Sequence, residues 1–165
     1  MDARKKALSL LAYGPRSKED LYNRLLDKGF PKEDVREALA EMEALGFVND
    51  GRLAADYVAY AIESKAYGQY RIIRDLVSKG IDETLAERAY KNYLQERREQ
   101  SINNELDEED VDLENAVATL EKRMERTGLD PDDLDHGDIR RLSGYLERRG
   151  FSFDVIDKAF ERVRQ

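Results

Sequence analysis

LLDKGF, residues 25–30, recurs in this chain as LVSKGI at residues 76–81 and as LERRGF at residues 146–151. Each copy begins with leucine and ends with a cation, a glycine and an apolar residue. Glycine commonly follows the last turn of a helix because it adopts the left-handed conformation, and a cation in that turn interacts favourably with the helix dipole. The three copies therefore predict three helix ends that are built alike.

The similarity extends beyond these letters when the copies are aligned on their glycines. Leucine or isoleucine stands four and eight residues before each glycine, on one helical face, and alanine stands nine residues after it. A small residue at that offset lets the next helix pack closely. The repeating unit is therefore a module of three helices, whose structural positions are Leu21, Leu25, Gly29 and Ala38; Ile72, Leu76, Gly80 and Ala89; and Leu142, Leu146, Gly150 and Ala159.

The rest of the chain fits an all-α fold of three tandem three-helix repeats. Only three prolines and ten glycines interrupt the 165 residues, and the glycines mostly stand where helices should end. We expect module 1 at residues 1–48, module 2 at 49–100, an acidic linker or helix extension at 101–113, and module 3 at 114–165. Seven acids lie between Glu105 and Glu114, and we interpret this stretch as solvated.

Capping residues predict where helices begin. The expected helices include roughly residues 3–13, 32–45 and 111–126. The candidate N-caps of the second, fourth, sixth, eighth and ninth helices are Ser17, Asn49 or Asp50, Asp82, Asp138 and Ser152.

The sequence offers no support for common catalytic chemistries. It contains no cysteine, no phosphate-binding glycine loop and no nucleophile elbow. Its one histidine, His136, lies near Asp133, Asp135 and Asp138, and we interpret this group as a loop and helix cap rather than a metal or acid–base site. We expect no enzyme activity, no cofactor and no metal.

The charge balance and hydropathy limit location and partners. A net charge of −8 disfavours sequence-independent DNA binding as the main activity, although local basic faces remain compatible with it. No stretch resembles a signal peptide or a membrane span, so we expect a cytoplasmic protein.

Outward cations are the candidate binding residues. On a helical wheel Arg71 and Arg74 point away from the apolar stripe of their helix, and Arg140, Arg141 and Arg148 do the same on theirs. Charges of this kind can serve solubility alone, or they can form a patch that attracts a protein or a nucleic acid.

Tyrosines gather around the fourth helix and its exit: Tyr57, Tyr60, Tyr67 and Tyr70. Such residues beside cations can stack on bases, but we favour packing in the core.

Four segments together resemble the RecX family, bacterial regulators of the RecA recombinase. They are ALSLLAYGPRSKEDLYNRLLDKGF, LGFVNDGRLAADYV, YGQYRIIRDLVSKGI and YLERRGFSFDVIDKAF, in the order and spacing of the family, and they cover roughly Ala7 to Val163. Two features depart from the family pattern: Leu53 stands where an aromatic residue is expected, and the acidic stretch is heavier than usual.

The resemblance implies an elongated, curved array of the three modules. It also implies a monomeric, non-enzymatic regulator that binds RecA filaments on single-stranded DNA and inhibits their ATPase, strand-exchange and co-protease activities, with weak direct contact to DNA. Family positions fall on Asp50, Arg52 and Tyr57; on Gly68, Arg71, Lys79 and Gly80; and on Arg148, Arg149 and Gly150. The candidate partner-binding residues are Arg52, Arg71, Arg74, Lys79, Arg140, Arg141, Arg148 and Arg149.

Two alternatives stay open at this point. One is a helical DNA-binding module acting directly on nucleic acid, and the other is a general scaffold. A direct binder should show strongly salt-dependent binding to bare DNA, whereas a filament regulator should need the recombinase.

Overall fold

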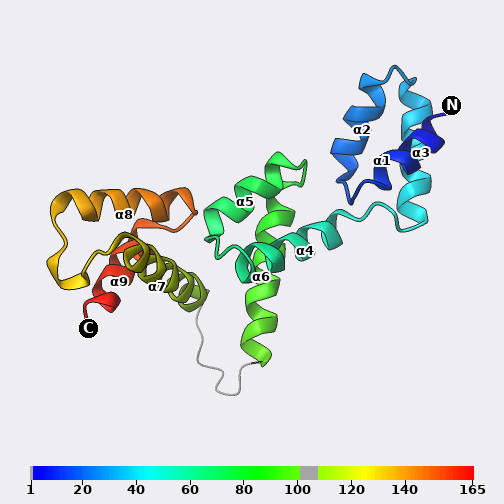
Figure 1. The fold of residues 1–165 in the computed structure, drawn as a ribbon. Coiled ribbons are helices and arrows are strands. Elements are labelled where there is room, and N and C mark those ends of the chain that lie inside the picture. Colours follow the sequence, from blue (N-terminus) through cyan, green and yellow to red (C-terminus); the bar gives the residue numbers. More distant parts are fainter. Residues whose placement is uncertain (1, 101–107) are drawn as a thin grey trace. The chain divides into compact units, whose positions relative to one another are not determined.

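The computed structural model describes residues 2–100 and 108–165, which are helical throughout with connecting turns (Figure 1). The all-α prediction is confirmed. The helices are α1 Ala3–Leu11, α2 Lys18–Asp27, α3 Lys32–Ala44, α4 Asp50–Glu63, α5 Gln69–Ser78, α6 Glu83–Gln100, α7 Glu108–Thr127, α8 His136–Arg148 and α9 Phe153–Val163, with a short 3-10 helix at Pro131–Asp133.

These residues form two compact units. The first unit runs up to Tyr57 and includes Asp75–Ala89; the second comprises Val58–Arg74 and Tyr90 to the C-terminus. In the first unit α1, α2 and α3 pack around one core, whose buried members are Ala7, Leu21, Leu25, Val35, Leu39, Met42 and Val48. In the second, α7, α8 and α9 enclose another, with Ala116, Leu120, Met124, Leu142, Leu146, Phe151, Val155, Ile156, Ala159 and Phe160.

The three repeated turns have the same backbone. Gly29, Gly80 and Gly150 have φ of +87°, +83° and +93°. In each copy the N–H after the glycine donates to the carbonyl of the leucine four residues before the glycine, at 3.1 to 3.3 Å. This is the Schellman arrangement that ends a helix, and side chains other than glycine rarely adopt such φ values.

Most helix starts carry the expected caps. The side chains of Ser17 and Ser152 accept the N–H three residues on, and those of Asn49 and Asp82 do the same for Arg52 and Leu85. The cap expected at Asp138 lies instead at Asp135.

α8 begins three residues earlier than a cap at Asp138 implies. Its N-cap is Asp135, and Asp138 is the third helical residue of a capping box in which each carboxylate accepts the other residue's N–H. A capping box uses two acids at one helix start. In the sequence, either acid taken alone therefore looks like the N-cap.

The acidic stretch is only partly within the described residues. Residues 101–107 lie outside them, so the linker expected there is a statement about sequence alone. The following residues belong to α7, which begins at Glu108 rather than near Val111, and Asp112 is buried rather than solvated.

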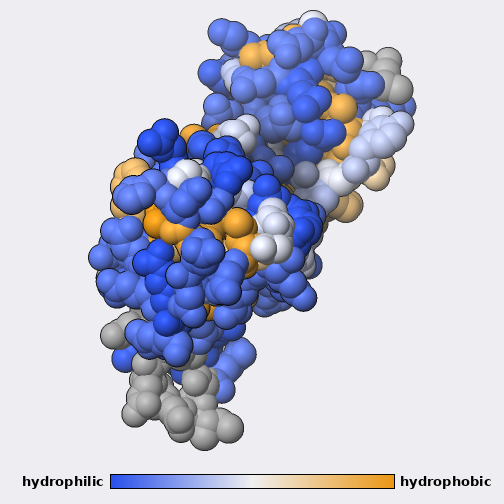
Figure 2. All heavy atoms as spheres, turned by 60° about the vertical axis from the view of Figure 1, so that its left-hand side comes forward, coloured by the Kyte–Doolittle hydropathy of each residue, from blue (hydrophilic) through white to orange (hydrophobic). Residues whose placement is uncertain are grey.

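On the face drawn in Figure 2, hydrophilic residues predominate and hydrophobic ones form small separate patches.

Candidate functional site

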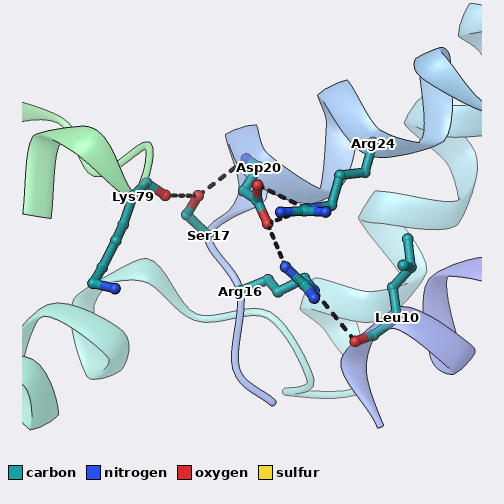
Figure 3. A network of polar contacts seen from close by, with 6 residues as sticks. All are labelled: Leu10, Arg16, Ser17, Asp20, Arg24 and Lys79. Atoms are coloured by element: carbon teal, nitrogen blue, oxygen red, sulfur yellow. Dashed lines mark hydrogen bonds and ion pairs between the residues drawn. The ribbon is translucent and has the colours of Figure 1, made fainter. Parts of the chain in front are cut away.

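The closing turn of α5 contacts the start of α2, within the first unit (Figure 3). The buried hydroxyl of Ser17 donates to the carbonyl of Lys79 at 2.6 Å and accepts the N–H of Asp20 at 3.0 Å. A Cβ at Gly80 would lie 2.7 Å from the Ser17 oxygen. The serine therefore caps its own helix and holds the next module's turn, which glycine alone lets approach.

An ion-pair network fixes the helix start that receives this turn. The carboxylate of Asp20 accepts from Arg16 and Arg24, both at 2.9 Å, and Arg16 also donates to the carbonyl of Leu10 at 3.2 Å (Figure 3). Partial burial raises the pKa of Asp20, but the hydrogen bonds and charges of the two arginines outweigh it and hold the pKa below its ordinary value. Asp20 is thus ionised and paired at neutral pH.

The closing turn of α8 contacts the start of α5 in the same manner, within the second unit. The N–H of Gly68 donates to the carbonyl of Arg149 at 2.8 Å, and that of Tyr70 to the carbonyl of Gly150 at 3.2 Å. A Cβ on Gly68 would lie 2.5 Å from the Gly150 oxygen, and one on Gly150 would overlap the backbone of Arg71. Two glycines therefore permit backbone to meet backbone.

The two contacts use equivalent positions of the repeat. Ser17 and Gly68 each stand twelve residues before the glycine of their own module, where the third module has Asp138 inside α8. At the remaining turn, a Cβ on Gly29 would meet nothing within 4 Å. The repeated motif is thus a docking element, used at Gly80 and Gly150 and open at Gly29.

Two of the candidate cations belong to the second docking contact. The guanidinium of Arg71 lies 3.8 Å from the centre of the Tyr67 ring and donates to the carbonyl of Arg148 at 3.2 Å. That of Arg149 lies 5.3 Å from the same ring and donates to the carbonyl of Lys65. The prediction that Arg71 is an exposed cation is therefore wrong, because the turn of α8 covers part of its side chain.

The other candidates of the second unit are exposed. Arg74 lies on α5, and Arg140, Arg141 and Arg148 lie on α8. Arg141 pairs with the nearly buried carboxylate of Asp138, so it also serves the start of its helix.

The last two candidates lie in the first unit. Arg52 pairs with Asp56 at 4.0 Å, and Lys79 places its ammonium 5.2 Å from the centre of the Tyr57 ring. The Tyr57 hydroxyl donates to Asp75 at 2.7 Å. The structure therefore brings together Arg71, Arg148 and Arg149 around one docking contact and distributes the remaining candidates over both units.

The tyrosines divide into two classes. Tyr60 and Tyr70 are 48% and 66% exposed, so the expectation of core packing is wrong for them. Tyr57 and Tyr67 are half-buried and each lies against a cation of a docking turn.

Sequence reasoning missed four cations that line a groove with Arg149. They are Lys65, at the exit of α4, and Lys122, Arg123 and Arg126, on α7. The sequence signal for the three α7 cations is their spacing within five residues, which places them on one side of a helix.

The sequence also offered no sign of the role of Asp112, an acid of α7 that the structure buries. Its carboxylate accepts the hydroxyl of Tyr90 at 2.9 Å and the N–H of Gln69 at 3.2 Å, so it joins three helices of the second unit. Burial raises the pKa of Asp112 above its ordinary value of 3.8, and the two hydrogen bonds oppose the shift without cancelling it.

This pKa predicts how stability depends on pH. An acid whose pKa is higher in the folded state favours folding most when protonated, so its contribution is complete below pH 3.8 and is lost as pH rises through the raised pKa. We expect the free energy of unfolding of the native chain, minus that of Asp112→Asn, to fall across this window. Urea titrations between pH 3.5 and pH 7, roughly the range over which carboxylates titrate, measure it. The exposed neighbour Glu114 is the control: a slope for Asp112→Asn no different from that for Glu114→Gln would contradict the assignment.

Other kinds of site find no support in the part of the chain that the structure describes. His136 is exposed at the start of α8, and no cluster of three or more histidine or carboxylate side chains there could hold a metal ion. No described helix has the length and apolar character needed to cross a membrane.

Comparison with known proteins agrees with the three-module repeat. Models of the first, second and third three-helix domains of RecX match residues 3–42, 49–89 and 110–160. The chain is 31% identical over 158 residues to a regulatory protein RecX of Legionella pneumophila, covering 96% of this chain and 92% of that one. A regulatory protein RecX of Trichlorobacter lovleyi is 28% identical over 142 residues, covering 86% of this chain and 82% of that one.

A solved structure supports the fold. The crystal structure of RecX from Lactobacillus salivarius superposes with a TM-score of 0.77 at 23% identity, covering 98% of this chain and 94% of the other.

Proposed function

The chain belongs to the RecX family of regulatory proteins, and on that premise we propose that it binds the filament that a RecA-type recombinase forms on single-stranded DNA. In this proposal it acts in the cytoplasm as a monomer, catalyses no reaction and lowers the filament's ATPase, strand-exchange and co-protease activities. The observation that carries the proposal is the match of all three RecX domain models, together with 31% identity to a RecX protein over 96% of the chain.

A tandem array of modules suits a periodic partner. If successive modules contact successive recombinase subunits, the second and third contacts form at a high effective concentration, so patches that are weak alone bind well together. Preferential binding to one filament conformation then shifts the population toward it. An elongated, curved arrangement, as the resemblance implies, would allow such contacts.

The exposed cations of the second unit are the proposed contact residues. Arg74, Arg140 and Arg148 have side chains open to solvent, whereas Arg71 and Arg149 serve the docking contact. Charged groups at the rim of an interface mainly steer association and confer specificity. We therefore assign contact with the partner to Arg74, Arg140 and Arg148. Arg71 and Arg149 position the turn of α8 on α5.

Binding to coated and bare DNA tests the proposal. Fluorescence anisotropy of the labelled chain should show binding to recombinase-coated single-stranded DNA at least about tenfold tighter than to the same DNA alone at physiological salt, since the contacts are to protein subunits. Equal affinity for the two would replace the proposal with the direct DNA binder, and no binding to either would reject both.

A further inference from the structure

One groove of the second unit brings together cations of α7 with cations that follow the ends of α4 and α8. It encloses about 370 Å³ between the residues that follow α4, the middle of α7 and the end of α8. Its lining includes Lys65, Lys122, Arg123, Arg126 and Arg149, and among the described lining residues Glu63 is the one acid. The carboxylate of Glu63 already accepts the hydroxyl of Tyr93 at 2.8 Å.

No acid among the described residues pairs with the cations that α7 places in this groove. Many surface cations of the chain are paired, as Arg4 is with Glu41 and Lys18 with Glu43. By contrast, Lys122, Arg123 and Arg126 form no ion pair with any residue that the structure describes. The groove therefore retains a local positive potential in a chain of net negative charge.

Two of the guanidinium groups are held in place before any ligand arrives. That of Arg123 lies 4.9 Å from the centre of the Tyr145 ring, and that of Arg149 lies 5.5 Å from it. Arg149 also donates to the Tyr145 hydroxyl at 3.4 Å and to the carbonyl of Lys65. Side chains ordered in this way lose less conformational entropy when they bind an anion.

Most of the net negative charge of the chain lies in one short stretch of sequence. Seven of the 36 acids stand between Glu105 and Glu114, where there is no cation, so the rest of the chain carries 29 acids against 28 lysines and arginines. Most of the net charge of −8 thus comes from this one short stretch, and the rest of the chain is close to neutral. Long-range repulsion of DNA is weaker than the total charge suggests.

We propose that this groove, lined by Lys65, Lys122, Arg123, Arg126 and Arg149, binds phosphate groups of a single-stranded DNA backbone. Lys122 and Arg126, four residues apart on α7, lie about 6 Å from each other on the helix surface and can engage neighbouring phosphates. A flexible strand presents a regular series of charges to such a row, whereas a peptide needs several acids at matching intervals. The proposal does not depend on the recombinase.

The test compares charge reversals in the groove and outside it. Lys122→Glu with Arg126→Glu is expected to weaken binding of a fluorescent oligothymidylate at low salt by about tenfold or more, and to reduce the slope of log K against log salt by about 1.4, since each lost phosphate contact removes about 0.7. Lys91→Glu with Arg98→Glu on α6 makes the same change of net charge on exposed residues outside the groove and should have a small effect. Circular dichroism checks that both variants fold.

The outcomes separate this proposal from the filament proposal. Equal losses in the two variants would show a general charge effect and overturn the groove. Stronger binding of polyglutamate than of the oligonucleotide would also overturn it and assign the groove to an acidic protein. Binding of the native chain to coated DNA is measured separately, so a failure of either proposal leaves the other readable.

Discussion

Gly150→Ala is expected to lower the free energy of unfolding by about 3 kcal/mol or more, because two costs act together. The left-handed φ of +93° costs a residue with a Cβ about 1–2 kcal/mol, and overlap with the backbone of Arg71 costs about 1–3 kcal/mol more. Backbone atoms cannot move aside as the end of a side chain can. Urea unfolding followed by circular dichroism measures the loss.

The chain supplies a matched control for each of the two costs. Gly29 has nearly the same φ, +87°, and open space around it, so Gly29→Ala should cost only the first, about 1–2 kcal/mol. Gly68 lacks the left-handed φ but faces the backbone of Gly150, so Gly68→Ala should show the second alone. Equal losses at Gly29 and Gly150, with none at Gly68, would mean that the turn of α8 does not dock on α5 in solution.

Charge reversal on α8 should have the largest effect on activity. Arg140→Glu with Arg148→Glu is expected to raise the concentration of chain needed for half-inhibition of the recombinase ATPase by about tenfold or more, since opposite charges become like charges at the interface. Arg141 is left unchanged because it pairs with Asp138 at the start of the helix. Helix content should be retained.

The control for this pair again changes the net charge equally. Lys91→Glu with Arg98→Glu alters exposed cations of α6 that belong to neither the groove nor the proposed interface. A comparable loss of inhibition in both pairs would mean that total charge, rather than the outer face of α8, governs the interaction.

The repeat could be predicted because its signals are local. A glycine after a last turn, a preceding cation and an N-cap such as Ser17 or Ser152 act within a few residues of sequence, and the structure contains them as expected. Where acids are abundant, several of them can cap the same helix, as Asp135 and Asp138 do together at the start of α8.

What could not be predicted arises from contacts between helices distant in sequence. A helical wheel identifies the face that a helix turns to its own module but not what a later module places on the other side. Arg71 is 77 residues from the carbonyl that it contacts, and Asp112 is 43 residues from Gln69. The groove likewise combines the arginine that follows α8 with cations of α7 and a lysine after α4.

The docking role of the repeated segment also depends on contacts between helices distant in sequence. Its glycine looks like a helix terminator in all three copies, and it is one. Only the structure reveals that at Gly80 and Gly150 the turn also docks on the preceding module's second helix. The family positions Gly68, Arg71 and Gly150 are therefore positions of one docking contact.

The most direct test of the account is the rate of ATP hydrolysis by recombinase filaments on single-stranded DNA as purified chain is added in substoichiometric amounts. A regulator that engages several subunits at once should lower the rate well before it equals the recombinase in concentration. We expect this fall, and we expect Arg140→Glu with Arg148→Glu to shift it to a higher concentration of chain. An unchanged rate, with no binding of the chain to the filament, would show that the chain is not a regulator of the recombinase filament.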